Sequence, residues 1–257
     1  MIFSIQHASF PNTSYVMGTM HSRDKRAFTY FERACELMEH CKVYSPEMNT
    51  HEVDAVALQR AFLLPAGMEL ENSLGRKKFD KAVHMLLKAF GVPLEALSNM
   101  SPIFIQGAMM ASCLGNDYAA TLDQYLLDHA LSKNMEIRGV ESPEDQYQIA
   151  RSLDPGVQIK QFATIIKRPD KFRHQAQRLA DYYSQNQTNA LYQLGKRGLG
   201  AFRKILLYER NYKMADTVYQ YALENATFTG IGAAHLPGEK GILRLLKLKG
   251  CKIKQIV

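Results

Sequence analysis

The chain has 257 residues, of which 46% are hydrophobic and 22% charged, which is typical of a globular protein and excludes a disordered one. The net charge is +7, with twelve Lys and Arg against three acidic residues over positions 160–213, but no aromatic-interleaved RNA-binding motif or phosphate loop accompanies them, so we expect no nucleic-acid partner. No apolar run approaches the roughly 18 residues of a membrane-spanning helix, and the four cysteines form no Cys-x-x-Cys pair that would indicate a zinc knuckle.

The N-terminal segment reads as strand, turn, strand, helix and strand. Residues 1–8 and 15–18 flank a Pro-Asn-Thr-Ser run, which predicts a hairpin. Residues 24–40 carry apolar side chains at the spacing of one helical face. The strand that we predict over residues 43–48 has Glu47 near its end.

The middle of the chain, residues 50–225, is mostly helical in its pattern. One short strand, residues 136–140, interrupts the helices and is followed by Glu141. Apolar positions recur at helical spacing, and Gly or Pro separates the segments, which predicts helices over residues 53–64, 77–90, 93–97, 103–114, 118–133, 156–166, 171–184, 188–194, 201–207 and 208–225.

The C-terminal segment, residues 226–257, repeats the order of the first 48 residues: a strand at 227–231, a helix at 239–249 and a strand at 251–257. Isolated two-stranded pieces are only marginally stable, so we expect the two end segments to share one sheet. The predicted fold is therefore α/β (α+β), a single domain spanning residues 1–257. Its central mixed sheet is built from two similar strand–helix–strand units, and the helical middle is a large insertion that caps the site.

A Gly-x-x-His tetrad follows a strand in each end segment. The first tetrad is Gly18-Thr19-Met20-His21, and the second tetrad is Gly232-Ala233-Ala234-His235. Residues just past strand ends lie at the rim of a sheet, where ligands of open α/β folds bind. A glycine before each histidine allows a sharp turn or a close approach of the backbone. We therefore expect the two histidines to meet at one site.

Two carboxylates follow strands in the same way, Glu47 and Glu141. Two imidazoles and one or two carboxylates form a common ligand set for a divalent metal that activates water, and one carboxylate can instead act as a general base. The alternative is a structural role for each residue, as a hydrogen-bonded histidine, a helix cap or an ion-pair partner. The duplicated context favours the functional interpretation.

Arg210 begins a further helical pattern, in the run Glu209-Arg210-Asn211. Its guanidinium can bind a carboxylate or a developing oxyanion. The alternative is a surface Glu–Arg pair that contributes less than about 1 kcal/mol.

These motifs resemble the TraB/GumN family, which includes the Tiki metalloproteases of animals, and the resemblance covers nearly the whole chain. It depends most on Gly232 to Gly238, read as Gly-Ala-Ala-His-Leu-Pro-Gly, and on Glu209-Arg210-Asn211. Residues that match the family pattern elsewhere are Met17 to His21, Glu47, Asp123, Ala130, Gly139 to Ser142 and Met214-Ala215.

The resemblance implies a metal-dependent hydrolase or peptidase, with Mn or Co as the favoured ion and Zn as a possible one. It implies that His21 and His235 are metal ligands or catalytic, that Glu47 is a ligand or base, and that Arg210 and Asn211 shape the site. Asp123 and Glu141 match the pattern with less defined roles. The fold is also similar to that of erythromycin esterases and of ChaN-like haem-uptake proteins.

We therefore predict a metal-dependent hydrolase, most simply a peptidase, acting on a peptide or small-molecule substrate. Two alternatives remain open: a non-catalytic protein that binds a peptide or a haem-like ligand, and a metal-free, esterase-like hydrolase with a histidine base. The N-terminus lacks the basic and then apolar order of a signal peptide, so the chain as it stands is expected in the cytoplasm, or outside it if a signal peptide has been removed.

Overall fold

The computed structural model describes all 257 residues, and they divide into two compact units. Unit 1 comprises Met1–Glu52, Gly115–Pro143 and Leu179–Val257, and unit 2 comprises Val53–Leu114 and Glu144–Arg178. Unit 1 therefore contains both end segments and, in addition, much of the helical middle of the chain. The capping role that we predict for the helical segment stays a prediction.

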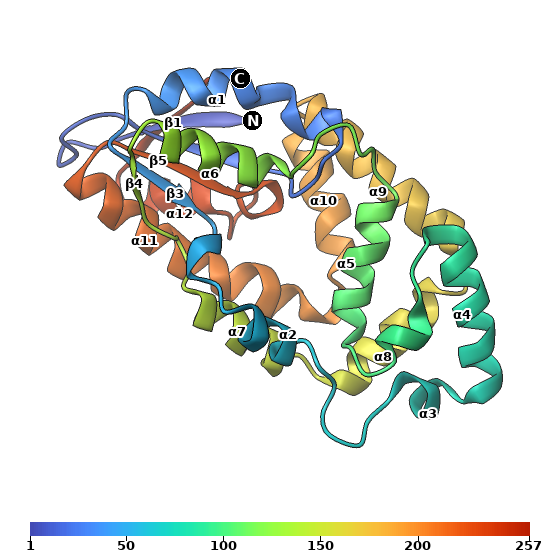
Figure 1. Cartoon of the computed structure of the whole chain (residues 1–257). Coiled ribbons are helices and arrows are strands. Elements are labelled where there is room, and N and C mark those ends of the chain that lie inside the picture. Colours follow the sequence, from blue (N-terminus) through green and yellow to red (C-terminus); the bar gives the residue numbers. More distant parts are fainter. The chain divides into compact units, whose positions relative to one another are not determined.

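Unit 1 is built on a six-stranded mixed sheet with the order β4-β3-β5-β2-β1-β6 (Figure 1). Strands β2, β5, β3 and β4 run parallel, whereas β1 pairs antiparallel with both β2 and β6. The predicted α/β (α+β) class and its mixed sheet are thus confirmed. The strands are β1 Ile2–Gln6, β2 Ser14–Thr19, β3 Val43–Pro46, β4 Glu136–Ile137, β5 Thr227–Gly232 and β6 Lys252–Gln255.

The two faces of this sheet bury different helices because side chains alternate along each strand. Met17 packs on one face with α1 Phe31–Met38 and α6 Leu122–Ser132. Val16 packs on the other face with α11 Arg210–Glu224 and α12 Ile242–Leu248. Figure 1 shows the sheet between these two pairs of helices. Because both faces are covered, the rim of the sheet is the part left for a site.

The remaining elements of unit 1 are short segments or belong to the helical middle of the chain. The predicted helix over residues 24–40 is divided at Tyr30, whose backbone, with φ −112° and ψ 9°, leaves the helical region. The 3₁₀ segment before it begins at the buried Asp24, whose side chain accepts from the Arg26 N–H. The other elements are α10 Thr188–Gly198, the π-helix Lys204–Glu209 and the 3₁₀ segments Lys25–Tyr30, Thr50–Glu52, Gly200–Phe202 and Ala233–His235.

Unit 2 is helical and has a core of its own. Leu70, Leu86, Leu94 and Phe162 are fully buried in that core. The residues before α2 and α8, Asp54 and Asp154, cap these helices, which explains where both begin. The helices are α2 Ala55–Ala61, α3 Leu70–Leu74, α4 Arg76–Phe90, α5 Pro102–Ser112, α7 Pro143–Ser152, α8 Pro155–Ile165 and α9 Pro169–Ser184, with a 3₁₀ segment at Leu94–Leu97; α9 crosses the boundary between the units.

None of these helices combines the length and the apolar character that crossing a membrane requires. The four cysteines are free thiols, and Cys113 and Cys251 are buried. Burial raises the pKa of both thiols, which keeps them protonated and inert.

Candidate functional site

The two tetrads leave the sheet side by side. Strands β2 and β5 are parallel neighbours, and Thr19 of the first tetrad is in register with Gly232 of the second. Parallel strands end at the same edge of a sheet, so His21 and His235 emerge from one rim. Each glycine permits close packing: a Cβ on Gly18 would lie 3.0 Å from the Cα of Ala233. The two end segments therefore meet where the sequence predicts.

Both predicted carboxylates lie at this rim. Glu47 directly follows β3, the parallel partner of β5 on the other side. Glu141 forms a parallel bridge with Met48, and its N–H donates to the Glu47 carbonyl at 2.9 Å. A Cβ on Gly232 would lie 3.2 Å from Oε2 of Glu47, so the glycine leaves room for the carboxylate.

Arg210 joins these two carboxylates. Its Nη2 donates to Oε1 of Glu47 at 2.5 Å and to Oε2 of Glu141 at 2.6 Å, and its Nε donates to Oε1 of Glu141 at 3.0 Å. The side chains of Arg210 and Glu141 are only 11% and 4% exposed. Arg210 is therefore a buried cation fixed by two carboxylates. It is not the exposed Glu–Arg pair that the sequence left as the alternative.

The π-helix Lys204–Glu209 delivers Arg210 to this position. It ends directly before Arg210, at the start of α11, and the Leu206 carbonyl accepts from Nη1 of Arg210 at 3.4 Å. π-Helical turns are rare and occur frequently at functional sites. We predict helices over residues 201–207 and 208–225. The structure instead has the π-helix Lys204–Glu209 directly before α11, so the boundary between the two helices falls at Arg210.

Glu47 is an ionised carboxylate. Its Oε1 accepts from Arg210, and its Oε2 accepts from the Gly232 N–H at 2.8 Å. Burial by itself raises the pKa of Glu47, but the charges of Arg210 and His235 and the Gly232 hydrogen bond together lower it to about 2. Glu47 therefore carries a negative charge throughout the physiological pH range.

His235 is held as a neutral imidazole. It is 7% exposed, and its Nδ1 lies 2.6 Å from Oδ1 of Asn211. The Asn211 amide nitrogen donates to the Lys240 carbonyl at 2.7 Å, so the amide oxygen must face the ring. The ring therefore carries its proton on Nδ1, and the lone pair of Nε2 faces Nη1 of Arg210 at 3.5 Å.

The surroundings of His235 oppose its protonation. Burial lowers its pKa, Glu47 raises it and Arg210 lowers it, and the result is a pKa of about 4. At neutral pH the Nε2 of His235 is thus unprotonated and accepts from Nη1 of Arg210 at 3.5 Å.

His21 has the opposite environment. Its side chain is 78% exposed, and its Nδ1 lies 3.2 Å from Oδ2 of Asp123, near the start of α6. The other oxygen of Asp123 accepts from the Thr19 hydroxyl at 2.8 Å, which orients the carboxylate. The hydrogen bond that the His21 ring donates to Asp123 is the largest influence on His21 and raises its pKa. Glu47 raises the pKa of both histidines, so its charge acts on both imidazoles.

The side chains as placed do not make a metal centre. No group of three or more His, Cys, Asp and Glu side chains is arranged to hold an ion. Both oxygens of Glu47, the predicted third ligand, already accept hydrogen bonds from Arg210 and Gly232. Two features do suit a metal: His21 and His235 each place Nδ1 against an oxygen, as metal-binding histidines usually do.

Three contributors to the site were not predicted from the sequence. The Lys240 carbonyl orients Asn211, the Thr19 hydroxyl orients Asp123, and the buried Tyr183 hydroxyl donates to the Gly18 carbonyl at 2.9 Å. Thr19 could have been found, because it is a polar residue inside the first tetrad. Nothing in the sequence points to Tyr183 or to a backbone carbonyl.

Comparison with known proteins identifies a family whose model covers nearly the whole chain. The family model described as TraB/PrgY/gumN family matches residues 4–255, a stretch that contains every residue of the candidate site. A search of curated proteins found no significant match, and neither did a search of solved structures.

Proposed function

This chain belongs to the TraB/PrgY/gumN family, and on that premise we propose that it is a hydrolase in which His235 and His21 carry the proton transfers. The observation that carries the proposal is the opposite effect of the site on the two imidazoles: the pKa of His235 is lowered to about 4, and that of His21 is raised. Titratable groups whose pKa values are pushed apart within one site are the usual pattern of an acid and a base.

His235 is the base in this proposal. Its Nε2 takes a proton from a water molecule while the water oxygen forms a bond to the substrate carbonyl carbon. Asn211 holds the Nδ1 proton of the ring, so the imidazolium that forms keeps its hydrogen bond. Glu47 is the weaker base of the two, because its pKa is about 2 and both of its oxygens already accept hydrogen bonds from Arg210 and Gly232.

His21 is the acid. The Asp123 carboxylate favours its protonated form, and its exposed ring can reach a leaving group at the rim. When the tetrahedral intermediate collapses, the bond from carbon to the leaving atom breaks and His21 supplies that atom's proton. His235 then returns its proton to solvent and His21 takes one up, so that substrate and water become an acid and an amine or alcohol.

Arg210 stabilises the developing negative charge. Its Nε and Nη2 donate to Glu47 and Glu141, and its Nη1, which also donates to the Leu206 carbonyl, faces the Nε2 of His235, beside the place where water would be activated. A fixed cation at that point favours an oxyanion over a neutral carbonyl. For the substrate we propose a peptide or other amide bond, as the resemblance to peptidases implies.

The test is turnover of a peptide library by the purified protein, with products identified by mass spectrometry, in the presence and absence of EDTA. We expect His235→Gln to lower the rate by at least about 100-fold, the usual effect of losing a general base. The matched control is His40→Gln, which removes an exposed histidine of the same unit and should leave the rate unchanged. Equal turnover by the wild-type protein and His235→Gln would refute the proposal.

A second candidate is the metal-dependent hydrolase expected from the resemblance. The observation in its favour is the orientation of His21 and His235, each of which places Nδ1 against an oxygen. A bound Mn²⁺ or Co²⁺ would supply Lewis acidity. Loss of turnover in EDTA and its recovery with Mn²⁺ would favour this candidate over the metal-free one.

A further inference from the structure

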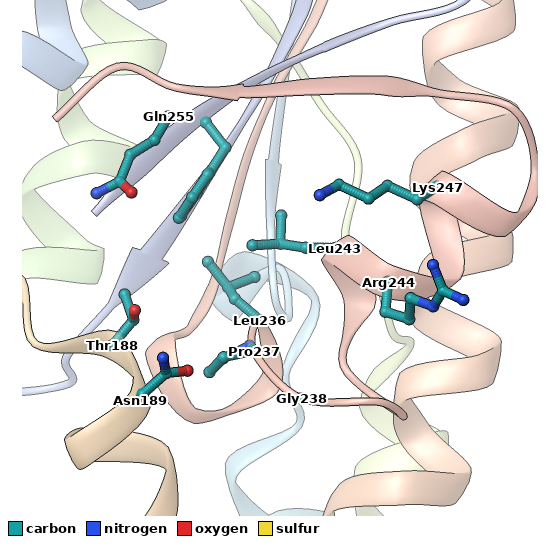
Figure 2. Close-up of a pocket in the computed structure, with 10 residues that line it drawn as sticks. Thr188, Asn189, Leu236, Pro237, Gly238, Leu243, Arg244, Lys247 and Gln255 are labelled. Carbon is teal, nitrogen blue, oxygen red and sulfur yellow. The ribbon is translucent and has the colours of Figure 1, made fainter.

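A second concave site lies on unit 1, apart from the candidate site. This pocket has a volume of about 290 Å³, and none of its ten lining residues belongs to the set around His21 and His235. Figure 2 shows that its residues come from the loop after the second tetrad, from α12, from the start of α10 and from the strands β1 and β6. It is therefore a separate site that shares only a loop with the tetrad.

The floor of the pocket is apolar. Phe3, Leu236 and Pro237 are buried, and Leu243 is half-buried beside them. The loop is firmly held against α10, because Gly238 has a φ of +96° and a Cβ there would lie 2.7 Å from Tyr192. This surface can accept a short aliphatic chain.

The rim of the pocket is cationic. Arg244 and Lys247 lie one turn apart on α12, and Figure 2 shows the amine of Lys247 extending across the pocket above Leu243. Neither cation forms an ion pair or a side-chain hydrogen bond, and no acidic residue lines the pocket. The other polar lining groups are Thr188, Asn189 and Gln255, which carry donors and no negative charge.

We propose that this pocket binds a small organic carboxylate with an aliphatic body. The unpaired cations attract the carboxylate, and the apolar floor takes the hydrocarbon. The volume is at the small end of ligand pockets, which restricts the occupant to a short chain. Inorganic phosphate would leave the apolar floor exposed to water and is the poorer ligand.

The same chemistry has two sources, a free carboxylic acid and the C-terminal residue of a peptide. Calorimetric titration with hexanoate tests the first, and titration with N-acetyl-alanyl-leucine tests the second; hexanamide and the amidated peptide are the uncharged counterparts. We expect saturable binding of at least one carboxylate and at least about tenfold weaker binding of its amide. Tighter binding of the peptide than of hexanoate identifies the C-terminus as the ligand, and the reverse identifies the free acid.

Two matched double variants distinguish binding in the pocket from a general effect of positive surface charge. Arg244→Gln/Lys247→Gln removes the two lining cations, and Lys252→Gln/Lys254→Gln removes two exposed cations of β6 that do not line the pocket. We expect the first double variant to bind the carboxylate at least about tenfold more weakly and the second to bind it within about twofold of wild type.

The proposal fails if neither carboxylate binds, if the amides bind as tightly, if both double variants behave alike, or if inorganic phosphate binds more tightly than hexanoate. Binding is measured directly and both double variants leave His21 and His235 intact, so the outcome does not depend on hydrolytic activity.

Discussion

The two tetrads share a pattern and a place in the sheet but not an environment. His21 is exposed and faces a carboxylate, and its pKa is raised. His235 is buried and faces an amide, and its pKa is lowered to about 4. The motif therefore brings the rings to one rim, whereas the residue opposite Nδ1 and the degree of burial decide which ring holds a proton.

The largest expected effect comes from removing the positive charge of Arg210, which binds the carboxylates of Glu47 and Glu141. Arg210→Met leaves the carboxylates of Glu47 and Glu141 without their cation, which should cost about 3–5 kcal/mol of unfolding free energy. Urea unfolding followed by circular dichroism measures the loss. The control is Arg203→Met, an exposed arginine without an ion pair, which should change stability by less than about 0.5 kcal/mol. A similar small loss for Arg210→Met would show that its charge is not buried between the carboxylates.

The next effect is a dependence of stability on pH that the buried histidine produces. The pKa of His235 is about 4 in the folded protein and near 6.5 for an exposed ring, so the unfolded chain binds the proton more tightly. Unfolding free energy should therefore fall by roughly 3 kcal/mol as pH decreases from 6.5 to 4.

His21 should contribute with the opposite sign. Its folded pKa is raised, so the stability that it adds is present below its unfolded pKa and is lost as pH rises through the folded value. Chemical denaturation at a series of pH values measures both. Most of the decrease toward pH 4 should disappear in His235→Gln, with a smaller part left from Glu47, whose pKa is also lowered, and the full decrease should persist in His21→Gln. Persistence of the full decrease in both variants would assign it to other groups.

The smallest and sharpest test exchanges the partners of the two rings. Asn211→Asp gives His235 a carboxylate like that of His21 and should raise its pKa, while Asp123→Asn gives His21 an amide and should lower its pKa. NMR titration of the imidazole protons measures both shifts. If neither pKa moves, the difference between the rings comes from burial and not from the partner opposite Nδ1.

Much of the fold follows from local pattern. The hairpin of β1 and β2, the parallel strand β3 and the helix α6 lie where residue periodicity predicts them, because each has an apolar face and turn residues at its ends. The strand predicted over residues 136–140 is shorter, Glu136–Ile137, although the N–H groups of Arg138 and Val140 still donate to the Tyr44 and Pro46 carbonyls of β3. The π-helix before Arg210 was missed, since helical periodicity does not register one extra residue per turn.

For the site, the sequence by itself determined which residues reach the rim: the two tetrads, Glu47 and Glu141 follow strands, and strand ends meet wherever strands are parallel neighbours. Only the tertiary structure decided what these residues are chemically. The ion pairs of Arg210, the amide of Asn211 held by a backbone carbonyl, and the burial of His235 join segments distant in the chain. Proton affinity depends on the charges and solvent around a group, and those are assembled only when the chain folds.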